Sequence, residues 1–270
     1  NQRHGRGKIL RLLVELSKAA NVLPPSLFVG DVICVNREVV ACGGYADIFR
    51  AERNGIAVAL KKLRVTQRWE TVKSSVSFHL DSSVHWLIRM YVQTFFRETL
   101  YWQCLKHEHI LPFLGVDCIT FVPYSCMVSP WMKYGNINQC MDTLESMNQE
   151  LPLKLWMYQI GLGLQYLHSE NVVHGDLRGA NILIDDELSV KLCDFGLAHF
   201  VDTSSASPGS YTGGACRWMS PSILRGGRPN YSSDIYAFGC VWLETHTRRA
   251  PFSNLSEHHM ISKVLEGTRP

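Results

Sequence analysis

The chain has 270 residues, of which 46% are hydrophobic, enough for one large domain or two packed lobes. A net charge of +3 and a pI near 8.4 are too mild, and the basic residues too scattered, to indicate a nucleic-acid-binding protein. The nine cysteines are an odd number and contain no Cys-x-x-Cys motif, which predicts reduced thiols in an intracellular, cytoplasmic protein.

Residues 1–30 form an N-terminal extension, in which residues 8–20 (KILRLLVELSKAA) predict an amphipathic helix. Four apolar side chains share one face of this helix: Ile9, Leu12, Leu13 and Leu16. Charged residues occupy the opposite face, and Pro24 and Pro25 follow as helix breakers. The apolar stretch is too short to span a membrane. The helix is expected to pack on the adjacent lobe or to bind a partner, and its charge pattern does not separate these alternatives.

Small residues and a lysine-bearing strand come next. Residues 41–46 (ACGGYA) form a small-residue turn, and Ile56–Leu63 (IAVALKKL) is an apolar strand. Because successive side chains on a strand point to opposite faces, Lys61 and Lys62 are expected on opposite faces of the sheet. Residues 95–106 (FFRETLYWQCLK) then predict a helix with apolar residues at helical spacing and with Glu98 inside it.

The segment before this helix is unusual. Residues 71–93 (TVKSSVSFHLDSSVHWLIRMYVQ) show no helix cap and no consistent period. We expect an insertion around residues 72–93 that stands outside the fold. A retained intron is one origin for it, because Val-Lys can be encoded by GTAAG and Val-Gln can end in CAG.

The most informative segment is residues 172–198 (VVHGDLRGANILIDDELSVKLCDFGLA). It places Asp176, Asn181 and Asp194 on two short loops that apolar, strand-like residues flank, with a short β-hairpin predicted between the loops. Two carboxylates and an amide are the groups that phosphoryl transfer requires. One carboxylate orients a hydroxyl, while the amide oxygen and the second carboxylate bind magnesium.

This segment resembles the catalytic and metal-binding loops of eukaryotic protein kinases, H-R-D-L-x-x-x-N followed by D-F-G. The resemblance implies an α+β, bilobal, protein-kinase-like fold. A five-stranded antiparallel small lobe with one main helix and the hinge would occupy residues 31–132. A mostly helical large lobe would occupy residues 133–270.

The same resemblance implies a role for each motif residue. Asp176 would orient the acceptor hydroxyl and accept its proton, while Asn181 and Asp194 would bind Mg²⁺. Lys61, at the end of Val-Ala-Leu-Lys, would bind the α- and β-phosphates of ATP, and Glu98 would hold Lys61 in place.

The ATP contacts carry over in the same way, to Ala41, Gly43, Gly44, Ile48, Ala59, Lys61, Ser129, Pro130, Met132 and Leu183. Ile48, Ala59 and Leu183 would enclose the adenine ring, although ordinary core packing is the alternative for all three. Backbone groups of Pro130 and Met132, in a segment that resembles the kinase hinge, would bind the edge of the ring.

Two downstream segments complete the resemblance. Residues 212–224 (TGGACRWMSPSIL) resemble the loop on which kinases dock their protein substrates. Residues 232–243 (SSDIYAFGCVWL) resemble the hydrophobic helix whose aspartate, here Asp234, supports the catalytic loop from below. Asp234 could equally stabilise the positive end of its own helix, and both roles can hold together.

The chain departs from the family pattern at four places. At residues 41–46, only one glycine of the family's G-x-G-x-x-G pattern is kept, and one extra glycine is present. Gly175 replaces an arginine that in the family receives an activation-loop phosphate. Ser222 replaces the glutamate that ends the family's docking loop. The fourth is the long separation of Lys61 from Glu98. Because the sequence stops at residues 267–270, before the closing helices of the family, we also expect a C-terminal truncation. These features leave open a pseudokinase that binds nucleotide or serves as a scaffold.

Arg217-Trp218-Met219 together with HGDLRGAN resembles the tyrosine-kinase-like group, particularly its fungal expansions. This similarity favours serine and threonine over tyrosine as acceptors. The predicted function is therefore an ATP- and Mg²⁺-dependent protein kinase with a protein substrate, and without a nucleic-acid partner or membrane span.

Overall fold

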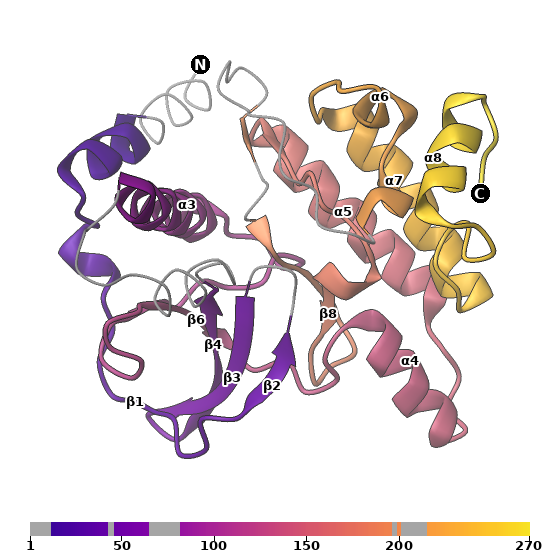
Figure 1. Ribbon diagram of the computed structural model, residues 1–270. Helices are drawn as coiled ribbons and strands as arrows, with labels where there is room; N and C mark the ends of the chain where they lie inside the picture. The colour runs from indigo at the N-terminus through magenta and orange to yellow at the C-terminus, as the bar shows by residue number, and fades with distance from the viewer. Residues whose placement is uncertain (1–11, 43–45, 65–81, 196–198, 201–214) are drawn as a thin grey trace. The chain divides into compact units, whose positions relative to one another are not determined.

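The computed structural model describes residues 12–42, 46–64, 82–195, 199–200 and 215–270 (Figure 1). The chain divides into two compact units. The first contains residues 1–104 and 112–131, and the second contains residues 105–111 and 132–270.

An antiparallel sheet forms the framework of the first unit (Figure 1). Its strands are β1 (Val32–Ile33), β2 (Val39–Cys42), β3 (Ala46–Arg53), β4 (Ile56–Leu63), β5 (Gly115–Asp117) and β6 (Cys126–Pro130). Residues Asn54 and Gly55 join β3 to β4, and their φ values of 52° and 76° suit the type I′ turn that hairpins favour. Because β1 and β2 pair with different parts of β3, these six strands occupy five positions across the sheet, in agreement with the predicted five-stranded sheet.

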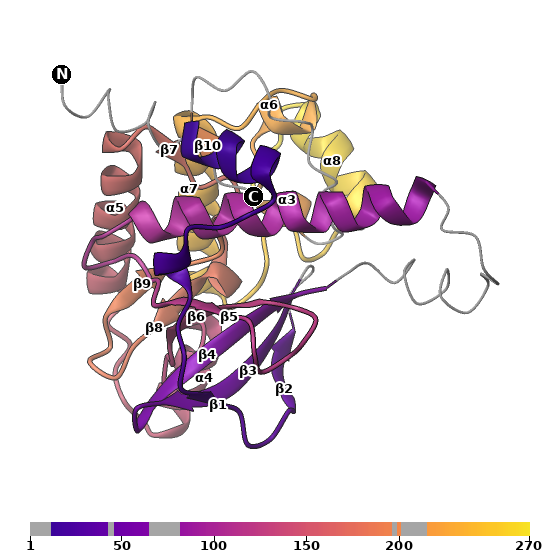
Figure 2. The same ribbon diagram turned by 90° about the vertical axis from the view of Figure 1, so that its left-hand side faces the viewer.

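Helix α3 (Ser82–Cys104) runs along the sheet in Figure 2. Phe95, Leu100 and Trp102 are buried, so the predicted helix at residues 95–106 is confirmed in type. The helix begins earlier than predicted, at Ser82, so residues 82–93 of the expected insertion are helical. The insertion itself stays a prediction. Helix propagation adds one hydrogen bond for each residue fixed, so a long helix tolerates a start without a predicted cap. Residues 72–81 lie outside the described residues.

The N-terminal segment belongs to the first unit, and residues 12–20 are helical beside α3 in both views (Figure 1, Figure 2). Two leucines of the predicted apolar face, Leu12 and Leu16, are 64% and 66% exposed, so this face is not buried against the first unit at these positions. The helix instead buries Val14 and Ser17, one turn apart. Partner binding through this helix stays a prediction. Ile9 lies outside the described residues.

The segment after this helix attaches to the edge of the sheet. A single turn, η1 (Pro25–Leu27), buries Leu27, and Val29 N then donates to Val116 O at 2.9 Å. Gly115, beside Val116, has a φ of +144°. A Cβ atom there would meet the Val29 side chain and lie 2.8 Å from Leu27 O. The close approach of this segment to β5 therefore requires glycine at position 115.

The second unit is mainly helical and carries the predicted hairpin. Its helices are α4 (Ile137–Ser146), α5 (Leu153–Ser169), α6 (Pro221–Leu224), α7 (Tyr231–Thr247) and α8 (Glu257–Leu265), with the single turns η2 (Gly179–Asn181) and η4 (Ala215–Trp218). Its strands are β7 (Val172–Val173), β8 (Ile182–Ile184), β9 (Val190–Leu192) and β10 (His199–Phe200). Strands β8 and β9 form the hairpin between Asn181 and Asp194, which confirms that prediction.

Helix α5 holds this hairpin in place. Trp156 Nε1 donates to Leu188 O at 2.8 Å in the hairpin turn, and Val190 N donates to Gln159 Oε1 at 3.0 Å. Trp156 is fully buried, so the hairpin has a rigid support. Within the described ranges, none of the helices combines the length and apolar character that a membrane span needs.

We predict that Gly115→Ala lowers the free energy of unfolding by about 2 kcal/mol, because the new methyl group meets the Leu27–Val29 backbone and side chains and imposes an unfavourable φ. Urea unfolding followed by fluorescence measures the change. Gly30→Ala is the matched control, because a Cβ atom at Gly30 has no neighbour within 4 Å. Equal stability of the two variants would contradict this account of the β5 edge.

Candidate active site

In the first unit, a buried ion pair joins strand β4 to helix α3. Lys61 Nζ donates to Glu98 Oε1 at 2.5 Å, and the two side chains are only 14% and 2% exposed. The structure therefore brings together the two residues predicted to pair. Removing two charges from water costs much of what their attraction supplies, so such a pair contributes little net stability. What it provides is a lysine with a fixed orientation.

The two adjacent lysines of β4 point to opposite faces of the sheet, as predicted. Lys62 Nζ lies 5.1 Å from the ring centroid of Phe49 and 5.2 Å from that of Phe121. Its ammonium group is therefore engaged by aromatic faces, through cation–π contacts. Only Lys61 of the two lies on the face that carries the ion pair with Glu98.

Four other predicted ATP-binding residues share the Lys61 face of the sheet. Ile48 is the direct cross-strand partner of Lys61, and Ala41 is the partner of Ile48. Ala59, two residues before Lys61, is paired with Ser129. Directly paired residues point to the same face, so the sheet brings these side chains together. The apolar cluster that includes Leu60 and Val128 occupies the other face.

The remaining ATP-binding predictions fall elsewhere. Pro130 pairs with Val58 and lies on the opposite face, which is compatible with a contact through its backbone. Gly43 and Gly44 lie outside the described residues. Met132 and Leu183 belong to the second unit, where Met132 is buried and Leu183 lies in β8.

In the second unit, the catalytic loop is closed by the predicted pair Asp176 and Asn181. Asn181 Nδ2 donates to Asp176 Oδ2 at 2.9 Å and to the Asp176 carbonyl oxygen at 2.7 Å. Turn η2 ends at Asn181, so this side chain bridges back across the loop. Arg178 Nε lies 3.5 Å from Asp176 Oδ2 and places a positive charge beside the carboxylate.

The surroundings of Asp176 raise the pKa of its carboxyl group above the ordinary value. Burial raises the pKa of the Asp176 carboxyl group, and the nearby Asp194 carboxylate also raises it. The Arg178 guanidinium and the hydrogen bond from Asn181 act in the opposite direction. A carboxylate with a raised pKa in a buried loop has the properties of a general base.

Asn181 and Asp194 are joined through the backbone, because Cys193 N donates to Asn181 O at 3.0 Å. Asp194 has a φ of 66°, in the left-handed region that is uncommon for residues other than glycine, and such conformations cluster at functional sites. An amide oxygen and a carboxylate are oxygen donors of the kind that Mg²⁺ accepts together with phosphate oxygens. The donor set of these two residues therefore fits a magnesium site.

A carboxylate on α7 supports the catalytic loop. Asp234 Oδ2 accepts from His174 N at 2.9 Å, and Asp234 Oδ1 accepts from Gly175 N at 3.0 Å. The capping box at the start of α7 is made by Asn230 and Ser233, so the carboxylate of Asp234 is available to the loop. Gly175 has a φ of 79°, which glycine adopts readily. The predicted supporting role of Asp234 is confirmed by this geometry.

A second carboxylate on α7 was missed by the sequence analysis. Glu244 is 6% exposed and accepts hydrogen bonds from Asn138 Nδ2, Gly179 N and Trp218 Nε1. The available signal was a lone acidic residue in the apolar run CVWLET, since a buried charge is rare unless it has partners.

The residues around Trp218 form a docking segment, which we define as residues 215–220. Arg217 attaches this segment to the loop before α8 by donating to the carbonyl oxygens of Pro251, Phe252 and Leu255 at 3.2, 2.5 and 2.8 Å. Ser222, where the family pattern has glutamate, instead lies 2.9 Å from Ser220, Oγ to Oγ. The docking segment therefore has anchors that do not depend on an acidic residue at position 222.

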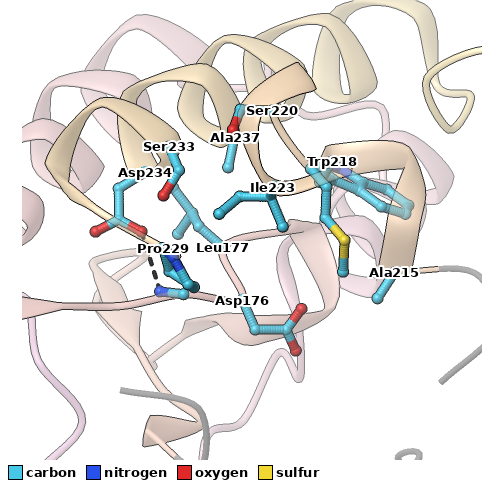
Figure 3. A pocket seen from close by; sticks show the side chains of 12 residues that line it. Asp176, Leu177, Ala215, Trp218, Ser220, Ile223, Pro229, Ser233, Asp234 and Ala237 are labelled. Atoms are coloured by element: carbon cyan, nitrogen blue, oxygen red, sulfur yellow. Dashed lines mark hydrogen bonds between the residues drawn. The ribbon is translucent and has the colours of Figure 1, made fainter. Parts of the chain in front are cut away.

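A small cavity lies between the catalytic loop and the docking segment (Figure 3). Its volume is about 20 Å³, close to the space that one water molecule needs. Asp234 and Trp218 lie toward opposite ends of it, with Ile223 between them, and Asp176 lies on its wall. The cavity lining combines apolar side chains with the candidate base.

We predict that Asp234→Ala lowers the free energy of unfolding by about 3 kcal/mol, because two amide groups of the catalytic loop lose their charged acceptor. Ser232→Ala is the matched control, since Ser232 is exposed on the same turn of α7. Chemical unfolding of both variants measures the difference. A loss in Asp234→Ala no larger than that of the control would show that the loop does not depend on this carboxylate.

Comparison with known proteins identifies the family of this fold and site. The family described as "Protein tyrosine and serine/threonine kinase" matches residues 85–270, more than half of the chain. This range contains Glu98, the catalytic loop, the Asp-Phe-Gly loop and α7. Lys61 lies before it.

Individual relatives extend the similarity toward the N-terminus. The chain is 30% identical over 246 residues to the "Putative serine/threonine-protein kinase/receptor R831" of Acanthamoeba polyphaga mimivirus. This match covers 89% of the chain and 13% of the relative. It is 29% identical to the "Serine/threonine-protein kinase CTR1" of Arabidopsis thaliana, covering 84% of the chain and 26% of the relative.

A third relative is the "Serine/threonine/tyrosine-protein kinase HT1" of Arabidopsis thaliana, at 28% identity over 84% of the chain and 53% of the relative. The chain thus spans between about an eighth and about a half of the length of these three relatives. The sequence motifs, the two supported loops and these matches agree, and the chain belongs to the protein tyrosine and serine/threonine kinase family.

Proposed function

We propose that the protein transfers the γ-phosphoryl group of ATP to a serine or threonine hydroxyl of a protein substrate. Members of its family generally use ATP and Mg²⁺. The observation that carries the proposal is that both halves of the required machinery are formed locally. The ion pair of Lys61 and Glu98 is in place, and so is the loop closed by Asp176 and Asn181.

Each side chain then has one task. Lys61, oriented by Glu98, binds the α- and β-phosphates of ATP. Asp176 orients the acceptor hydroxyl and takes its proton, a role that its buried position and raised pKa support. Asn181 and Asp194 hold Mg²⁺, which neutralises phosphate charge when it is bound.

The preference for serine and threonine rests on relatives whose names carry that specificity, and on the motif HGDLRGAN. We also assign the chain to the tyrosine-kinase-like group, in line with Arg217-Trp218-Met219, and within it to the fungal-type expansion. A cytoplasmic setting is part of the proposal, and the absence of a Cys-x-x-Cys motif among the nine cysteines supports it.

We predict that Lys61→Met reduces phosphoryl transfer by roughly 100-fold or more, because the phosphates lose their fixed cation. The measurement is transfer of radiolabelled phosphate from ATP to a peptide library containing serine, threonine and tyrosine, followed by phosphoamino acid analysis. Lys62→Met is the matched control, because the neighbouring lysine faces aromatic rings on the other side of β4. Unchanged transfer in Lys61→Met would overturn the role of this residue.

Two further measurements separate the alternatives. Asp176→Asn keeps the shape of the loop while removing the base, so it is expected to lose transfer without losing the fold. Stabilisation of the wild-type chain by Mg-ATP without any transfer would identify a nucleotide-binding module instead of a kinase. Transfer to tyrosine alone would contradict the proposed acceptor.

We predict that the rate of phosphoryl transfer falls at acidic pH, where Asp176 becomes protonated and can no longer act as a base. Because the pKa of Asp176 is raised, the midpoint of this fall should lie above the ordinary aspartate pKa of about 3.9. Arg178→Gln removes a positive charge that favours the carboxylate, so it should move this acidic limb to still higher pH. The pH dependence of kcat/KM for both proteins measures the shift. A limb that does not move in Arg178→Gln would exclude Asp176 as its origin.

A further inference from the structure

We propose that Glu244 is a positioning residue that couples the docking segment to the catalytic loop and thereby sets the affinity for the protein substrate. The inference rests on the proposed kinase function. Its basis is that one buried carboxylate is the shared acceptor of groups from three separate elements of the second unit.

The contacts of Glu244 are specific. Its Oε2 accepts from Gly179 N at 3.0 Å and from Trp218 Nε1 at 2.9 Å, while its Oε1 accepts from Asn138 Nδ2 at 2.8 Å. These donors come from the catalytic loop, the docking segment and α4. Hydrogen bonds to a charged acceptor are about twice as strong as those between neutral groups, and burial strengthens them further.

On the catalytic side, the contact requires glycine. A Cβ atom at Gly179 would lie 2.6 Å from Glu244 Oε1 and 2.8 Å from Asn138 Nδ2, so these two hydrogen-bonded side chains would have to shift. Gly179 begins the turn η2, which ends at Asn181, the residue that bridges to Asp176. A shift of the Glu244 carboxylate would therefore move Gly179 and, through the short turn η2, Asn181 as well.

On the docking side, Trp218 lines the cavity that also contains Asp176 and Leu177 (Figure 3). Its indole Nε1 is held by the same oxygen that holds Gly179 N. Because both donors share one acceptor, a displacement of the indole alters the contact with the catalytic loop, and the reverse also holds. A peptide whose hydroxyl is bound at Asp176 passes beside this wall, so the coupling acts on peptide binding.

The experiment compares four variants in steady-state kinetics, with peptide and ATP varied separately. Trp218→Phe removes the indole donor and keeps a smaller aromatic ring. It is expected to raise the KM for peptide by about tenfold, while the KM for ATP stays within about twofold of wild type. Glu244→Ala is expected to lower kcat by about tenfold or more as well, because Gly179 also loses its acceptor. Trp242→Phe, on the exposed face of the same helix, is the matched control and should behave as wild type.

Glu244→Gln is the conservative variant that tests the geometry. Its amide oxygen can accept from Gly179 and Trp218, and the Asn138 amide can turn to accept from its NH₂ group. We expect this variant to restore most of the activity lost in Glu244→Ala. Equal damage in the Gln and Ala variants, or an unchanged peptide KM in Trp218→Phe, would overturn the proposal.

Failure of the proposed function has a different outcome. A wild-type chain that transfers no phosphate contradicts the kinase assignment, and the coupling is then tested by hydrogen exchange. In Glu244→Ala, exchange is expected to increase at both residues 177–181 and residues 215–219. An increase confined to one of these segments would contradict the coupling whether or not the chain is active.

Discussion

The catalytic loop has an irregular backbone, and three of its amide groups, those of His174, Gly175 and Gly179, donate to acceptors outside the loop. Helix α7 provides them from two positions. Asp234 binds the amides of His174 and Gly175, and Glu244 binds the amide of Gly179. Ten residues of helix rise about 15 Å, so one rigid element supports both ends of the loop. The placement of Asp176 and Asn181 follows from this support.

In the first unit, an ion pair fixes the orientation of a site residue. Lys61 is held on β4 by Glu98 from α3, and both side chains are largely removed from water. A buried pair of this kind is a poor source of stability, and a well-packed apolar pair of equal volume often serves the fold as well. Its presence is better explained by the need for a lysine of fixed orientation that can meet an anion. In the second unit, Asp194 has a left-handed backbone conformation that costs free energy. Like the buried ion pair, this conformation adds little to the stability of the fold.

Much of the site could be predicted from the sequence because its motifs are local. Asp176, Asn181 and Asp194 lie within a stretch of 19 residues, and alternation along β4 alone separates Lys61 from Lys62. Contacts made between distant segments were harder to predict. Glu244 carries no motif, and its partners Asn138, Gly179 and Trp218 precede it by 106, 65 and 26 residues.

The errors in the fold prediction have different causes. The start of α3 was placed too late because residues 71–93 show no consistent hydrophobic period, whereas helix propagation needs only one backbone hydrogen bond for each added residue. The buried face of residues 12–20 was assigned by hydrophobicity, whereas the docking of Val14 and Ser17 leaves two leucines exposed. Tertiary contacts decided the second case. The roles of Gly43 and Gly44 remain predictions.

The attachment of residues 27–29 to β5 has a practical consequence for work with fragments of this protein. Val29 and Leu27 fit against Gly115, and the Val29 amide is bonded to Val116 at the sheet edge. A recombinant piece cut at Asp31, just before the first strand, would expose that edge and the apolar contacts beneath it. Exposed strand edges invite pairing between molecules. Expression boundaries should therefore precede residue 12, so that this strand edge stays covered in material used for kinetic work.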